Sequence, residues 1–199
     1  MSHVMTQIRT LAGTEVVREK GARRALAVTL FAVATALSAH AAVPIPGTAV
    51  PISMQTLVVS LAGLLLGARL GALSQALYLM AGIAGLPVFA NGAFGMAYLM
   101  GPTGGFLLAF PAAAAATGWL AERARDDGSW AGAARLFGAI FLATLLVLVG
   151  GWAQLTLLVG DPRAAFALGV APFVVGDMLK SLLALLVARR LRKRTLGLL

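Results

Sequence analysis

The sequence predicts an all-α integral membrane protein, built as a single domain of six transmembrane helices with both termini in the cytoplasm. Of its 199 residues, 60% are hydrophobic and only 12% are charged, and the mean hydropathy is +0.91. Soluble domains carry about 25% charged residues, and a soluble chain of this size could not hide so many apolar side chains from water. Intrinsic disorder is excluded because disordered chains are poor in apolar residues.

Long intervals without charge supply the spans, because a transmembrane helix needs about 20 mainly apolar residues. Between Arg24 and Arg69 the only Asp, Glu, Lys, Arg or His is His40, and between Arg69 and Glu122 there is none. Proline and glycine divide these intervals, since each breaks or loosens a helix. The six expected spans are 25–42, 52–67, 72–85, 106–121, 136–159 and 172–188.

The connections between the spans follow from proline and glycine. The prolines of 43–51 predict a short extended loop after the first span. Gly67 and Gly71 predict a tight turn between the second and third spans, which are short enough to be tilted or partly sheltered by protein. The glycine-rich segment 86–105 predicts an irregular loop, and Pro111 inside the fourth span is tolerated if neighbouring helices satisfy the freed carbonyl.

The expected organisation has three parts. A cytoplasmic N-terminal segment 1–24 precedes the transmembrane domain 25–188, and a basic cytoplasmic tail 189–199 follows it. An alternative for the first span is a signal peptide, because two arginines, an apolar run and Ala39-His40-Ala41 imitate a cleavage site. The charged segment before the run is long for such a peptide, which favours an uncleaved span.

The positive charges set the orientation. The formal net charge is +9, and most cations fall in short runs beside apolar stretches, which favours membrane orientation over nucleic-acid binding. With both termini inside, only Arg163 lies outside and only Lys180 lies within a span. The other 14 of the 16 cations are then cytoplasmic: Arg9, Arg18, Lys20, Arg23, Arg24, Arg69, Arg123, Arg125, Arg135, Arg189, Arg190, Arg192, Lys193 and Arg194. We expect a multi-pass protein of the cell membrane, surrounded by lipid.

Missing residue types narrow the function. The chain has no cysteine and only two histidines, which excludes thiolate metal sites and makes a histidine-based metal site or triad untenable. It has no nucleotide-binding loop of the G-x-x-x-x-G-K-[ST] type and no H-E-x-x-H or G-x-S-x-G motif. We therefore expect no cofactor, no metal and no enzymatic activity.

Asp177 and Lys180 are the sharpest feature of the sequence. Each costs roughly 2.5–3.5 kcal/mol at the centre of a transmembrane helix, and their i, i+3 spacing places them on one face of the sixth span. Intramembrane ionisable residues are functional candidates by default, so we favour a ligand site. The alternative is an internal ion pair that ties the bundle together.

Further polar and aromatic residues are secondary candidates for the same site. Asn91 lies in the outer loop as Asn91-Gly92, which is equally typical of a turn. Phe89 and Tyr98 are candidates for an apolar pocket wall or for an interfacial belt. Gln55 and Thr56 begin the second span from outside, where helix capping and interhelical hydrogen bonds are the favoured alternative.

Several blocks of the chain resemble one membrane-protein family. These blocks are Val43-Pro44-Ile45-Pro46-Gly47, Pro51-Ile52, Gln55-Thr56-Leu57, Leu61-Ala62-Gly63-Leu64-Leu65-Leu66-Gly67, Gly85-Leu86-Pro87-Val88-Phe89, Gly101-Pro102-Thr103-Gly104-Gly105-Phe106, Pro172-Phe173 and Gly176-Asp177-x-x-Lys180. Together they resemble the BioY family, the biotin-specific substrate-binding (S) component of energy-coupling-factor (ECF) transporters. Phe106 stands where tyrosine is common in that family.

The resemblance implies a six-helix protein that captures biotin from outside with very high affinity. It implies that Asn91, Asp177 and Lys180 contact biotin, and that small residues of the first span, here Ala32 and Ala36, dock a transmembrane coupling subunit. Two ATP-binding-cassette ATPases energise such a complex, although some family members are found without dedicated partners.

The chemistry of the residues agrees with this ligand. Biotin has a ureido ring with two N–H donors and a carbonyl, and a carboxylate on its tail. Asp177 can accept from the ureido group, and Lys180 can pair with the carboxylate or neutralise Asp177, two roles that the sequence leaves open. The rival hypotheses are an S component for another small vitamin, an intramembrane enzyme acting on lipid, and a purely structural bundle.

Overall fold

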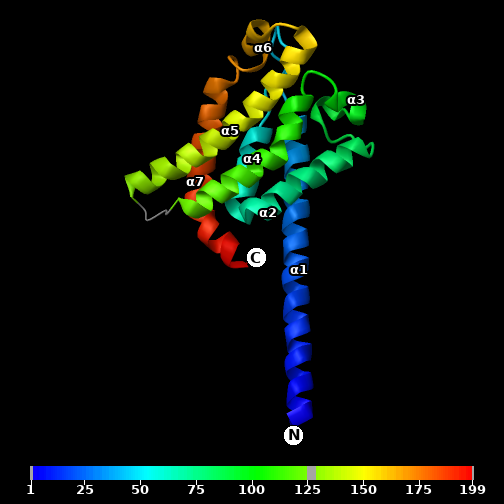
Figure 1. Ribbon diagram of the computed structural model, residues 1–199, viewed down its shortest axis with the longest axis vertical. Coiled ribbons are helices and arrows are strands. Elements are labelled where there is room, and N and C mark those ends of the chain that lie inside the picture. Colours follow the sequence, from blue (N-terminus) through cyan, green and yellow to red (C-terminus); the bar gives the residue numbers. More distant parts are fainter. Residues whose placement is uncertain (1, 125–128, 199) are drawn as a thin grey trace.

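The computed structural model describes residues 2–124 and 129–198, and over these ranges the protein is helical (Figure 1). One isolated antiparallel bridge, between Val43 and Ile52, joins the two ends of the first loop, and the described residues form no sheet. The elements in chain order are α1 (Ser2–His40), α2 (Gln55–Ile83), the 3-10 helix η1 (Ala90–Gly92), α3 (Met96–Leu99), α4 (Gly104–Arg123), α5 (Trp130–Val159), α6 (Pro162–Gly169) and α7 (Val174–Leu198).

Length and composition identify the candidate membrane spans. Among the described residues, four helices are long and apolar enough to cross a membrane on their own: α1 over Glu19–His40, α2, α4 and α5. The pair α6 and α7 passes the same test only together, with a bend of 48° at the break between them. The expected all-helical membrane protein is therefore confirmed with four to five candidate spans, and the division into six stays a prediction.

Helix α2 contains the turn that the sequence predicted between the second and third spans. At Gly67 the backbone leaves the helical region, with φ 81° and ψ 175°. The chain doubles back so closely that a Cβ on Gly71 would lie 2.9 Å from the Cα of Gly63. The backbone N–H of Ala68 donates to Glu122 Oε1 at 3.3 Å, which binds the turn to the end of α4.

Helix α1 runs without a break through residues 2–24 of the predicted N-terminal segment and through most of the expected first span, ending at His40. Its first half projects away from the bundle, while its second half packs against α2 (Figure 1). Within that second half, Thr35 and Ala39 have no exposed surface. Helix α1 therefore contributes to the interior of the bundle, and the uncleaved first span stays a prediction.

The connections between helices separate into the two ends of the bundle (Figure 1). One end holds the turn at Gly67, the last residues of α4, the first residues of α5 and the end of α7, and the other holds the segments 41–54 and 84–103 together with α6. The cytoplasmic placement of the first end stays a prediction. The larger core cluster consists of aromatic and aliphatic residues, including Tyr78, Phe89 and Phe110. It joins the helices to the segments 41–54 and 84–103.

Candidate functional site

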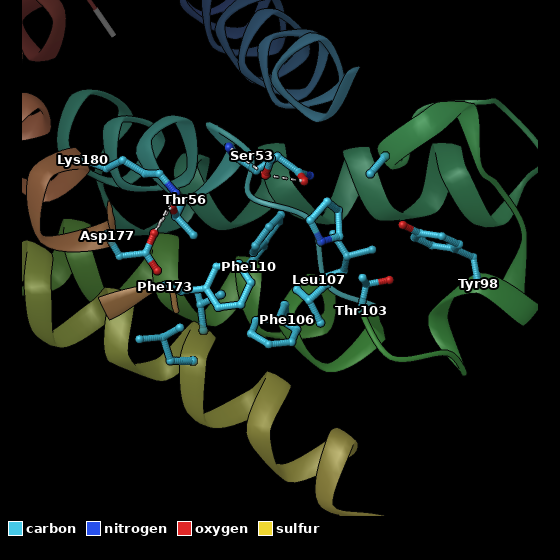
Figure 2. A pocket seen from close by; sticks show the side chains of 16 residues that line it. Ser53, Thr56, Tyr98, Thr103, Phe106, Leu107, Phe110, Phe173, Asp177 and Lys180 are labelled. Atoms are coloured by element: carbon cyan, nitrogen blue, oxygen red, sulfur yellow. Dashed lines mark hydrogen bonds and ion pairs between the residues drawn. The ribbon is translucent and has the colours of Figure 1, made fainter. Parts of the chain in front are cut away.

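A cavity lies among α2, α4, α5 and α7 at the end of the bundle that holds the segments 41–54 and 84–103 (Figure 2). Its empty space is about 560 Å³ when the open space at its mouth is counted. The lining residues are Val50, Pro51, Ser53, Gln55, Thr56, Ala90, Tyr98, Thr103, Phe106, Leu107, Phe110, Val147, Leu148, Phe173, Asp177 and Lys180.

Asp177 and Lys180 form the charged end of this cavity. Lys180 Nζ donates to Asp177 Oδ1 at 2.9 Å, and both side chains are buried, with 2% of Asp177 and 7% of Lys180 exposed. Thr56 Oγ1 donates to the same oxygen at 2.9 Å. Asp177 lies in the first turn of α7, where the helix dipole favours a negative charge. The predicted pair is thus a real ion pair, one turn of helix apart.

The ion pair leaves hydrogen-bonding capacity unused. Both bonds to Asp177 fall on Oδ1, and no bond from the described residues reaches Oδ2. The Lys180 ammonium has three N–H donors, and one of them is engaged by the described chain. Burial of unpaired charge and polar atoms is costly unless a partner compensates them. A ligand with both donors and acceptors would supply that compensation.

The cavity has a second polar region on the side away from the ion pair, and aromatic rings line the space between the two polar regions. Figure 2 shows Tyr98 and Thr103 on the side away from Asp177, with Phe106, Phe110 and Phe173 between the two ends. The arrangement suits an elongated ligand that has polar groups at both ends and an apolar middle.

Ser53 and Gln55 hold each other in place at the edge of this apolar section. Ser53 Oγ donates to Gln55 Oε1 at 3.0 Å, and Gln55 Nε2 donates to the hydroxyl of Tyr78 at 2.9 Å. The amide of Gln55, which is 6% exposed, is therefore fixed from both of its ends. Gln55 lines the cavity, so these bonds set how its amide faces a ligand.

The structure brings together most, but not all, of the predicted site residues. The cavity is lined by Asp177, Lys180, Gln55, Thr56 and Tyr98. The other two predicted residues are Phe89 and Asn91. Phe89 is fully buried behind Tyr98, with ring centroids 5.3 Å apart and planes 16° from parallel. Asn91 does not line the cavity: it is exposed and adopts the left-handed conformation, φ 59°, which is typical of an asparagine in a turn.

The small residues of α1 pack toward the protein's own core. Ala32 is 7% exposed and belongs to the main core cluster, and Ala36 packs against the same cluster. Their small side chains let α1 approach the bundle closely, and the docking role of the partly exposed Ala36 and of Ala32 stays a prediction. The exposed side of α1 carries large apolar side chains, namely Leu26, Leu30, Val33 and Leu37.

Sequence reasoning missed several residues of the site. Ser53 lies at the start of the expected second span, and Thr103 lies in the glycine-rich segment 86–105. Phe110 and Phe173 lie among the apolar residues of expected spans, where an aromatic ring carries no signal of a site. Tyr78 lies in the middle of an apolar run, and only its hydroxyl, which needs a partner inside a membrane, signalled a role.

The fold and the cavity together define an all-helical membrane protein with a cavity of mixed polar and apolar lining between its helices. The chain belongs to the BioY family, whose model matches residues 6–196. This is a family of transporters and not of enzymes.

Individual proteins of known name are similar to this chain over most of its length. The probable biotin transporter BioY of Pyrococcus horikoshii is 38% identical over 168 residues, which cover 84% of this chain and 95% of that protein. The biotin transporter BioY of Thermotoga maritima is 38% identical over 76% of this chain and 86% of that protein. Among solved structures, the S-component for biotin from an ECF-type ABC transporter superposes with a TM-score of 0.80, covering 87% of this chain and 92% of that chain at 24% identity. This last likeness supports the fold.

Proposed function

We propose that this protein captures biotin from the outer side of the membrane as the substrate-binding component of an ECF-type transporter. The observation that carries the proposal is the buried pair of Asp177 and Lys180, whose unused hydrogen-bonding capacity lies at one end of an otherwise largely apolar cavity. Relatives that match most of the chain are named biotin transporters.

The cavity matches the chemistry of biotin. The Asp177 carboxylate is an acceptor for the two ureido N–H groups, and the Lys180 ammonium is a donor for the ureido carbonyl or the valerate carboxylate. The fused rings and the aliphatic tail need an apolar wall, which Phe106, Phe110 and Phe173 provide. The second polar region, at Tyr98 and Thr103, is available to whichever end of biotin lies away from the ion pair.

The same proposal includes six spans and an inward orientation of both termini. The turn at Gly67 divides α2 into two spans, and α6 becomes a short helix on the outer side that leads into α7. Biotin then enters from outside between the segments 43–51 and 86–105. Because the sequence has no nucleotide-binding loop, energy for release comes from partners, namely a transmembrane coupling subunit and ABC-type ATPases.

Equilibrium binding of radiolabelled biotin to the purified full-length protein tests the proposal. We expect saturable binding with a submicromolar Kd, and at least tenfold weaker binding for Asp177→Asn, because the neutral amide loses the ionic acceptor. Asp161→Asn is the matched control, since Asp161 is the N-cap of α6 outside the cavity and asparagine also caps helices. A wild-type Kd of micromolar or above, or displacement of biotin by an unrelated vitamin, contradicts the proposal.

A further inference from the structure

Tyr78 is the largest of the fully buried side chains among the described residues, yet it does not line the cavity. It lies on the second half of α2, is 1% exposed, and its hydroxyl accepts from Gln55 Nε2 at 2.9 Å. We infer that Tyr78 is a positioning residue for the ligand cavity, one that sets biotin affinity through Gln55 without touching the ligand. The inference rests on the proposed function.

The ring of Tyr78 connects separate parts of the cavity wall. It packs against Phe110 with ring centroids 6.4 Å apart, and against Phe89 edge-on at 5.6 Å. Phe89 in turn stacks on Tyr98 at 5.3 Å. The two ends of this aromatic row, Tyr98 and Phe110, line the cavity, whereas the two middle rings are buried behind it.

The backbone is shaped to accept this row. Gly82 lies one turn after Tyr78 on α2, and a Cβ at Gly82 would overlap the ring of Phe89. The loop that carries Phe89 is bound to the same place, because the backbone N–H of Gly95 donates to the carbonyl of Gly82 at 2.8 Å. The second half of α2 is therefore a fixed support for the outer loop.

The hydroxyl adds a directional contact to this packing. Gln55 is held by Ser53 at Oε1 and by Tyr78 at Nε2. When the Tyr78 hydroxyl is removed, Nε2 loses its acceptor inside the protein, where an unpaired donor is costly. The Gln55 amide then rotates toward another acceptor and no longer presents its original face to the cavity. Tyr78→Phe removes this contact alone, since every ring contact remains.

A double-mutant cycle on biotin binding tests this inference. The four proteins are the wild type, Tyr78→Phe, Gln55→Leu and the double variant. We expect Tyr78→Phe to raise the Kd for biotin by about tenfold, and to have less than a twofold effect when Gln55 is already leucine. A merely structural tyrosine would weaken binding equally in both backgrounds.

The outcomes are distinguishable. If the wild type does not bind biotin, the proposed function fails and this inference fails with it. If the wild type binds and the two substitutions have additive effects, or if Tyr78→Phe changes the Kd by less than twofold, only this inference is overturned. Should Tyr78→Phe fail to fold, Ser53→Ala replaces it in the cycle, because Ser53 fixes the same amide from its other end. Additive effects of Ser53→Ala and Gln55→Leu then overturn the inference.

Discussion

Two buried polar clusters in this protein differ in one respect that separates function from architecture. Asp177, Lys180 and Thr56 meet at the cavity and leave a carboxylate oxygen and ammonium donors unused by the described chain. The second cluster joins α1 to α2 away from the cavity. There Thr35 donates to Gln75 Oε1, Gln75 Nε2 donates to Ser74 Oγ, and Ser74 donates to the carbonyl of Gly71.

The difference indicates what each cluster does. All three side chains of the second cluster have no exposed surface, and each has a partner within the chain. Every side-chain polar atom of this cluster has at least one partner, and such networks join helices in a membrane. The cluster at the cavity is incomplete without a ligand. Burial alone therefore does not mark a functional site, whereas burial with unsatisfied capacity beside a cavity does.

The largest effect is expected when both charges of the cavity are removed. In the double variant Asp177→Leu with Lys180→Met, biotin binding should fall by roughly a thousandfold or more, since two or three charge-assisted contacts are lost. Stability should be unchanged or higher by about 1–4 kcal/mol, because replacing a buried ion pair with apolar side chains is often neutral or stabilising. Biotin binding and thermal unfolding measure the two effects.

The single substitution Asp177→Leu is the control for this double variant. It leaves Lys180 buried without its partner, so we expect it to destabilise the protein by about 3–5 kcal/mol. A double variant that fails to fold would instead identify the ion pair as a structural tie and contradict the comparison between the two clusters.

A substitution in the second cluster should lower the stability of the protein and leave its affinity for biotin unchanged. Gln75→Leu removes the amide that bridges Thr35 and Ser74. We expect a loss of about 0.6–1.7 kcal/mol in unfolding free energy, from the average to the maximum measured for polar contacts between membrane helices. Its Kd for biotin should stay within about twofold of the wild type, because Gln75 does not line the cavity. A tenfold loss of affinity with unchanged stability would remove the distinction between the clusters.

The sequence predicted the helices and the charged pair because both leave strong local signals. A charge at membrane depth stands out against an apolar run, and Gly67 at a turn stands out against helix formers. The position of Ala32 was not predictable in the same way, since a small-xxx-small pattern allows close approach to any neighbour and the neighbour here is the protein's own core. The partnership of Tyr78 with Gln55 joins residues 23 positions apart across a turn, which no local pattern encodes.

A smaller effect is expected at the support of the outer loop. Gln154 Nε2 donates to the carbonyls of Leu99 and Gly101, at 2.8 and 2.7 Å, and so holds the segment that places Tyr98 and Thr103 in the cavity wall. Gln154→Met should loosen this segment and speed biotin release by about threefold to tenfold.

Stopped-flow or filter measurements of the release rate check this effect. Thr156→Val is the matched control, because the Thr156 hydroxyl donates only to the carbonyl of Trp152 on its own helix. Equal release rates in Gln154→Met and the wild type would show that the loop does not depend on this amide.

The smallest effect is expected at Asn91, where the sequence-based prediction and the structure part most clearly. Asn91 is exposed at φ 59° and ψ 26°, a conformation that glycine adopts without strain. Asn91→Gly therefore keeps the turn and removes only the side chain, and we expect the Kd for biotin to stay within about twofold of the wild type. Asn91→Ala is the companion variant, whose left-handed strain of about 1 kcal/mol reports on the turn itself. A tenfold weaker Kd for Asn91→Gly would mean that the loop closes on bound biotin and brings this amide to the ligand, as the family resemblance implies. The polar contacts of the cavity would then be completed by a residue that lies outside it in the structure.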